Sequence, residues 1–170
     1  MNMKVCYDLL LKWAESCKCQ LFSLYLQRYH IMGTDTVNTK AEPAYRSRLN
    51  TEKANELYIQ ILEKLTREKL YRDPQYNTKR LAADLHTNTR YISAAVALCT
   101  GNNYSALVNS LRLRDVCKMM RSPKHKDMTV EEIGLLSGFS SRQAFYLAFH
   151  RIYACTPRAY RLQIKKELGF

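Results

Sequence analysis

Four neighbouring polar residues near the C-terminus carry side chains that are suited to reading nucleic-acid bases. They are Ser141, Arg142, Gln143 and Tyr146. An arginine can donate two parallel hydrogen bonds to guanine, and a glutamine can pair with adenine in the same two-point manner. The chemistry available here is therefore recognition of base edges in the major groove. A solvated helix surface with an N-terminal cap is the alternative interpretation.

A second group of polar residues, Thr89, Arg90 and Ser93, has a similar setting earlier in the chain. These side chains also offer donors and acceptors of the kind that contact base edges. They form the second set of candidate base-reading residues. A solvated helix surface is an equally good interpretation of this set.

Residues 129–154 have the pattern of two short helices joined by a tight turn. The first helix has apolar residues at helical spacing: Val130, Ile133 and Leu136. Gly138 follows, and glycine suits the left-handed backbone that ends a helix and permits a sharp turn. Either Ser140 or Ser141 can cap the next helix, because a serine oxygen accepts from its first N–H groups. The pattern therefore places Arg142 in the first turn of a helix.

Two aromatic residues indicate how these helices pack. Phe145 and Phe149 are four positions apart, so they share the face that is directed toward the first helix. Gly134 has no side chain and allows the two helices to approach closely. These features are what a helix-turn-helix unit requires.

The same pattern occurs once more over residues 78–101. Leu81–Ala82 corresponds to Ile133–Gly134, and Asn88 or Thr89 can cap the following helix. The inward residues of that helix are Ile92 and Val96. They lie one position earlier, relative to the small residue, than their counterparts in the second unit. The chain therefore contains two units with a one-residue offset.

One amphipathic helix over residues 104–121 connects the two units. A single stiff helix would hold the units at a fixed separation, and two recognition helices about 34 Å apart can enter successive major grooves. Residues 51–170 contain 20 Lys and Arg against 11 Asp and Glu, so they carry most of the chain's net charge of +12. Such an excess attracts phosphates.

The predicted fold class is all-α, with two helix-turn-helix subdomains, a long connecting helix and an extra N-terminal amphipathic helix. The chain has only five Gly and four Pro and shows no alternating strand pattern. A further helix begins after Asn50, which is a good N-cap residue. The helical domain is predicted over residues 51–170 and ends in a terminal helix at 157–168.

The chain resembles the AraC/XylS family of transcription regulators over roughly residues 52–163. The matching motifs are Thr100–Gly101, Asn109–Arg112, Glu132–Gly134, Ser137–Ser141, Phe145, Phe149, Thr156–Pro157 and Tyr160–Arg161. The resemblance implies that a bacterial-type regulator reads about two turns of promoter DNA. It also implies that the regulator usually activates genes through contact with RNA polymerase.

Four arginines are candidate phosphate contacts, which position a protein on DNA without reading its sequence. They are Arg112, Arg151, Arg158 and Arg161. Arg161 can instead cap the final helix or pair with an acid.

Three departures from the family pattern predict unequal units. Residues 93–99 of the first recognition helix lack the Arg or Lys residues that relatives commonly carry there, and Leu147 replaces a usual basic residue in the second unit. Ala154 occupies a position where relatives often have a helix-ending glycine, so we expect a strained turn. The second unit should therefore give most of the base reading.

A protein-interaction or antagonist module of the same fold is the competing interpretation. It rests on the Ala, Val and Leu residues at 94–98, which could bind a partner regulator. An enzyme is not expected, because the sequence shows no phosphate loop, paired carboxylates or nucleophile–histidine arrangement. The acids at Asp84, Asp115, Glu131 and Glu132 have the setting of ordinary helix-surface acids or caps. No metal or cofactor is expected.

Residues 1–32 form a predicted amphipathic helix that could dimerise or signal, and residues 33–50 form a predicted linker. Cys17, Cys19 and His30 make the one cluster with any metal-binding potential, and buried cysteines in a reducing compartment are the favoured interpretation. No run of 18 apolar residues exists, so no membrane partner is expected. The expected location is the cytoplasm, on the nucleoid.

Overall fold

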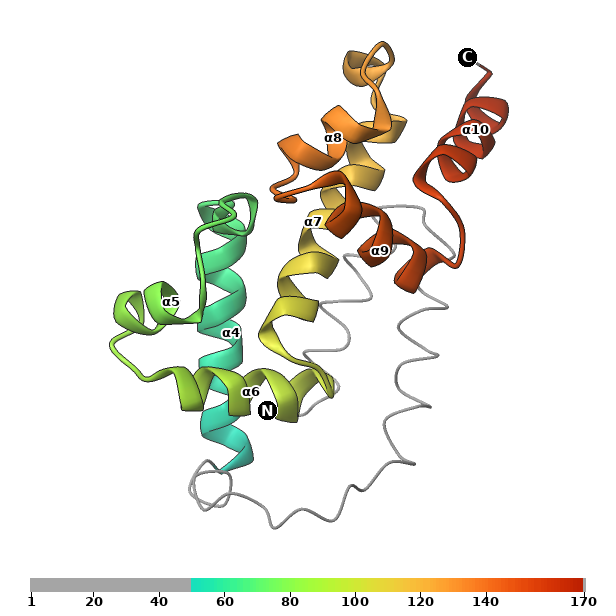
Figure 1. The fold of residues 1–170 in the computed structure, drawn as a ribbon. Coiled ribbons are helices and arrows are strands. Elements are labelled where there is room, and N and C mark those ends of the chain that lie inside the picture. The colour runs from blue at the N-terminus through green and yellow to red at the C-terminus, as the bar shows by residue number, and fades with distance from the viewer. Residues whose placement is uncertain (1–49, 170) are drawn as a thin grey trace. The chain divides into compact units, whose positions relative to one another are not determined.

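A computed structural model describes residues 50–169 of the chain (Figure 1). The sequence hypotheses for residues 1–49, including the amphipathic helix, the linker and the cysteine cluster, lie outside the described residues. The described residues belong to one compact unit. Its helices are α4 (Thr51–Arg67), α5 (Thr78–Asp84), α6 (Thr89–Thr100), α7 (Tyr104–Arg121), α8 (Val130–Leu136), α9 (Arg142–Tyr153) and α10 (Pro157–Leu168), with short 3-10 helices η1 (Leu70–Arg72) and η2 (Pro123–His125). No strand occurs within residues 50–169, which confirms the all-α fold class there.

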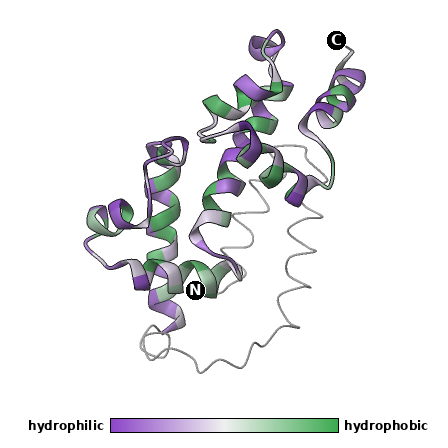
Figure 2. Ribbon diagram, in the orientation of Figure 1, coloured by the Kyte–Doolittle hydropathy of each residue, from purple (hydrophilic) through white to green (hydrophobic). Residues whose placement is uncertain are grey.

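Helix α4 covers the first helix-turn-helix unit. Asn50 caps it by accepting from the Glu52 backbone N–H at 2.6 Å. The buried residues of α4 recur three and four positions apart: Ala54, Tyr58, Ile61 and Leu65. This stripe packs mainly against α6, and hydrophobic residues recur along both helices (green in Figure 2). The helix ends at Arg67, well before Pro74, and Lys69 then adopts a left-handed backbone with φ 54°.

Helices α5 and α6 form the first unit. Asn77 caps α5, and Asn88 caps α6 by accepting from the Tyr91 N–H at 3.0 Å. Ile92 and Val96 are fully buried, which confirms the inward stripe expected for this helix.

Helix α7 contributes buried side chains along its whole length because it contacts elements of both units. Its N-terminal half buries Leu107 and Leu111, and its C-terminal half buries Val116 and Met120. The same helix therefore supports both cores.

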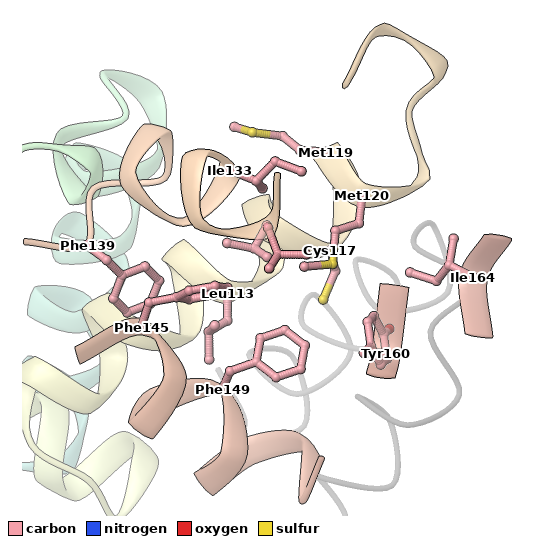
Figure 3. Packing of buried hydrophobic residues seen from close by; sticks show 12 residues of the cluster. Leu113, Cys117, Met119, Met120, Ile133, Phe139, Phe145, Phe149, Tyr160 and Ile164 are labelled. Atoms are coloured by element: carbon pink, nitrogen blue, oxygen red, sulfur yellow. The ribbon is translucent and has the colours of Figure 1, made fainter. Parts of the chain in front are cut away.

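The core of the second unit lies between α7, α8, α9 and α10 (Figure 3). The Phe145 and Phe149 rings meet edge to face at 5.8 Å, and Tyr160 packs on Phe149 at 5.4 Å. A Cβ on Gly134 would lie 2.8 Å from the Phe145 ring, so only glycine lets α8 approach α9 this closely. The inward roles expected for Gly134, Phe145 and Phe149 are therefore confirmed.

One residue of the expected apolar series lies elsewhere. Leu136 is 52% exposed, whereas Phe139 is buried at 3%. Helix α8 ends at Leu136, and the turn at Gly138, with φ 96°, then directs Phe139 into the core. The turn thus supplies Phe139 to the core, whereas Leu136, the last member of the apolar series, lies at the surface.

Candidate nucleic-acid interface

The first turn of α9 presents its polar side chains to solvent. Ser141 is the N-cap, and its Oγ accepts from the Ala144 N–H at 3.1 Å. Arg142 and Gln143 follow directly, and both are exposed. Because Ser141 uses its hydroxyl oxygen as the cap, Arg142 and Gln143 are the exposed polar side chains of this turn that take no part in capping.

Three of the predicted DNA-contacting residues converge on one carboxylate. The Tyr146 hydroxyl donates to Glu131 Oε1 at 2.8 Å, and the Arg158 guanidinium donates to the same oxygen at 2.8 Å. Arg142 Nε lies 3.7 Å from that oxygen. Glu131 comes from the first turn of α8, Tyr146 and Arg142 from α9, and Arg158 from the start of α10. We name this group the Glu131 cluster.

The protonation states of the Glu131 cluster are set by these contacts. Partial burial alone would raise the pKa of Glu131, but hydrogen bonds from Tyr146, from its own backbone N–H and from Arg158 outweigh burial and lower that pKa. Burial and the hydrogen bond to Glu131 raise the pKa of Tyr146. At neutral pH the cluster therefore holds an ionised carboxylate and a protonated phenol that donates to it.

Arg142 is restrained on two sides although its side chain is 65% exposed. Its guanidinium carbon lies 5.2 Å from the centre of the Tyr146 ring, within range of a cation–π interaction. Its Nε is directed toward Glu131, which leaves the two terminal nitrogens for other contacts.

The first turn of α6 is also open to solvent. Arg90 and Ser93 are exposed, and Thr89 is half-buried. Because Asn88 is the N-cap, Thr89 is the first residue of the helix.

Most of the apolar run that follows on α6 is buried inside the domain. Ala94, Ala95 and Val96 are buried at 2% or less, since α4 packs on this helix. Only Leu98 within the 94–98 run is a large exposed apolar side chain, at 45%. The partner surface expected from this run is therefore reduced to little more than Leu98.

Besides Arg158, two of the predicted phosphate contacts are engaged within the fold. Arg112 Nε donates to the Tyr71 carbonyl at 2.5 Å, and its Nη2 group donates to the Asp73 carbonyl at 3.3 Å. Burial lowers the pKa of Arg112, and its guanidinium lies 5.7 Å from the Phe139 ring. Arg112 thereby ties the segment after η1 to α7. Its phosphate role stays a prediction, and two of its hydrogen-bond donors are used within the fold.

Arg161 has a similar internal role. It donates to the carbonyls of Met128, of His125 at 3.1 Å and of Lys126 at 2.8 Å. These carbonyls belong to the end of η2 and the loop that leads into α8, so Arg161 neither caps the final helix nor pairs with an acid in these contacts. Arg151, in contrast, is exposed on α9, with no hydrogen bond or ion pair to the rest of residues 50–169.

Sequence reasoning missed the roles of three acids. Glu131 organises the cluster described above, and Asp115 accepts from Tyr71 at 2.9 Å and from Arg72 at 2.6 Å. Asp84 accepts from the Tyr76 hydroxyl at 2.7 Å. Glu132 has the capping role that its position predicts, because it completes a capping box with Thr129.

Neither a metal site nor a membrane span is found in the part of the chain that the structure describes. Residues 50–169 hold no group of three or more His, Cys, Asp and Glu side chains arranged to bind a metal ion. None of the helices in this range combines the length and the hydropathy needed to cross a bilayer.

Comparisons with known proteins agree with this architecture. Residues 81–163 match a family model described as a helix-turn-helix domain. A solved structure of a protein of unknown function from Listeria innocua is 22% identical with a TM-score of 0.53, and the match covers 62% of this chain and 94% of that chain. That likeness shows the fold. No curated protein matches the sequence. The match over residues 81–163 is to a helix-turn-helix domain of the AraC type, and it supports a DNA-binding role in transcription regulation.

Proposed function

We propose that the protein binds double-stranded promoter DNA at a specific sequence and regulates transcription. In this proposal α9 and α6 each present their first turn to a major groove, and the two grooves are successive on one face of the duplex. The observation that carries the proposal is the exposed pair Arg142 and Gln143 at the capped start of α9. This residue pair can read guanine and adenine.

The second unit supplies most of the sequence reading in this proposal. Its first turn contains Arg142, Gln143 and the Tyr146 ring that supports Arg142. The first unit offers Arg90 and Ser93, with Thr89 half-buried. Contacts from α6 therefore consist of fewer hydrogen bonds and more shape contact.

Phosphate contacts position the domain in the same proposal. Arg151 on α9 makes no hydrogen bond or ion pair within the described residues, so its guanidinium can bind phosphate. Arg158 donates one N–H group to Glu131 and has further N–H groups for a phosphate. The positive charge of residues 51–170 adds a sequence-independent attraction that weakens as salt rises.

The AraC-type match extends the proposal to partners and location. We propose RNA polymerase as a partner at an activated promoter, and the bacterial cytoplasm, on the nucleoid, as the location. The amphipathic pattern of residues 1–32 adds a homodimer formed through that segment. Light scattering of the chain with and without residues 1–40 tests the dimer, because a dimer formed through this segment would become a monomer when the segment is removed.

Selection of the full chain against a random double-stranded DNA library tests the function. We expect an enriched motif that survives excess non-specific DNA, with a preference of about a thousandfold or more over unrelated sequence. A selection that enriches no motif, with DNA binding that is abolished equally for all sequences by moderate salt, would contradict the proposal. Capture of a partner regulator in that case would favour the interaction module.

A further inference from the structure

The Glu131 cluster places a negative charge beside the residues proposed to read bases. An acid at a DNA interface opposes phosphate binding, so Glu131 lowers the affinity for DNA of any sequence. The Glu131 side chain is 22% exposed, and its Oε1 accepts from two donors and faces a third. These contacts determine which arrangement Arg142 and Tyr146 adopt before DNA arrives.

The contact with Glu131 fixes the hydrogen-bonding character of Tyr146. An ionised carboxylate only accepts, so the Tyr146 proton is committed to Glu131 and the phenolic oxygen retains only its lone pairs. Toward a base edge, that oxygen can then accept. The major-groove donors that it can accept from are the amino groups of cytosine and adenine.

The same carboxylate restricts Arg142. The ion pair is made through Nε, and the Tyr146 ring lies against the guanidinium. Both restraints leave the two terminal nitrogens for guanine O6 and N7, which is the geometry of a bidentate contact. A side chain that is already restrained loses less rotamer freedom on binding than a free arginine does.

We propose that Glu131 is a positioning residue that sets the base preference of α9, by fixing Arg142 and Tyr146 and by disfavouring DNA of arbitrary sequence. This inference rests on the proposed function, because it assigns a determinant of specificity to the same interface. Glu131 itself touches no base in this account.

The test compares two identical chemical changes at neighbouring residues. E131Q removes the negative charge of the carboxylate from the cluster. E132Q removes the same charge one residue away, and glutamine at that position still completes the capping box with Thr129. The affinity of each full-length variant is measured for the selected site, for the site with the guanine contacted by Arg142 replaced, and for unrelated DNA.

We expect E131Q to bind unrelated DNA more tightly and to lose about fivefold or more of its preference for the contacted guanine. E132Q should change all three affinities by the same factor and keep its preference within about twofold of the wild type. In an R142A background, E131Q should cause no further loss of preference, because the positioned side chain is gone. Y146F, which removes only the hydroxyl that donates to Glu131, should also lower the preference.

Each contrary outcome has a separate meaning. A wild-type chain with a preferred site and an E131Q variant with an unchanged preference would overturn this inference and leave the proposed function standing. An equal loss from E131Q with and without Arg142 would also overturn it. A wild-type chain with no preferred site would overturn both the inference and the proposed function. If E131Q does not fold, Y146F decides the question by the same measurements.

Discussion

Gly138 packs directly on the main chain of Arg72. Gly138 lies in the turn of the second unit with φ 96°, and a Cβ built on it would lie 2.5 Å from the Arg72 Cα and 2.6 Å from the Arg72 carbonyl carbon. Arg72 also binds Asp115 of α7, and Arg112 of α7 binds the carbonyls on either side of Arg72. The turn of the second unit is thus held by a direct backbone contact with η1, and η1 is in turn tied to the connecting helix α7.

The first prediction concerns this contact. G138A should lower the free energy of unfolding by about 2–4 kcal/mol, because it adds left-handed backbone strain to a backbone clash. G101A is the matched control: Gly101 has φ 68°, and a Cβ added there would have no atom within 4 Å, so only the strain of about 1–2 kcal/mol applies. Urea unfolding of both variants measures the difference. Equal losses would show that the Arg72 contact has no energetic weight.

The second prediction compares the two recognition helices. R142A should weaken binding to the selected site by about 1–3 kcal/mol, the value of a good bidentate pair. R90A should cost less, because no aromatic ring or acid restrains Arg90 in the described contacts. Gel-shift titrations at one salt concentration compare the two variants. A larger loss for R90A than for R142A would reverse the proposed asymmetry of the two units.

The third prediction separates an arginine that binds phosphate from one that supports the fold. R151A should leave stability unchanged and reduce the slope of log affinity against log salt by about one. R112M should leave that slope nearly unchanged and lower stability by about 1–3 kcal/mol, because it leaves part-buried carbonyls without a donor. Thermal unfolding and salt-dependent gel shifts distinguish the two. A unit change in slope for R112M would restore Arg112 as a phosphate contact.

The fourth prediction uses the pH dependence of stability. Burial raises the pKa of Tyr104 to about 12, and its hydroxyl has no hydrogen-bond partner within residues 50–169. The folded state favours the neutral phenol, so this contribution is complete below the ordinary value of 10.0 and is lost as pH rises toward 12. Y104F should therefore unfold less readily at high pH than the wild type. Its free energy of unfolding should also be higher than that of the wild type by about 1 kcal/mol at neutral pH, because an unpaired buried hydroxyl is removed.

Unfolding midpoints of the wild type and Y104F between pH 8 and 11 provide the measurement. Because burial also raises the pKa of Tyr71 and Tyr76, the wild-type loss should become shallower in Y104F rather than disappear. Parallel curves for the two proteins would mean that Tyr104 does not ionise late in the folded state.

The local boundaries of the domain could be predicted from the sequence because single residues determine them. Gly138 and Ala154 both adopt the left-handed backbone expected at their positions, the latter with φ 53°. The sequence offers two serines, Ser140 and Ser141, as the N-cap of α9, and Ser141 is the N-cap in the structure. Such features depend on neighbours within a few positions, which is the range that a sequence pattern encodes.

The interactions between helices could not be predicted in the same way. Glu131 meets Tyr146 and Arg158 because α8, α9 and the start of α10 cross at particular angles, and no sequence spacing reports those angles. Likewise, the uncharged run on α6 could be interpreted from the sequence as a partner surface. The sequence pattern does not show that α4 packs on this helix. Ala94 and Ala95 are buried, at 2% and 0% exposure, so they offer no surface to a partner.

The most direct test of the account is a footprint of the full chain on its selected DNA site, combined with methylation interference at guanine N7. The account predicts two protected major-groove segments on one face of the duplex, with centres about 10 base pairs apart. The stronger interference should lie in the segment that R142A alone disrupts. One protected segment, or two segments on opposite faces, would contradict the claim that α6 and α9 read successive grooves.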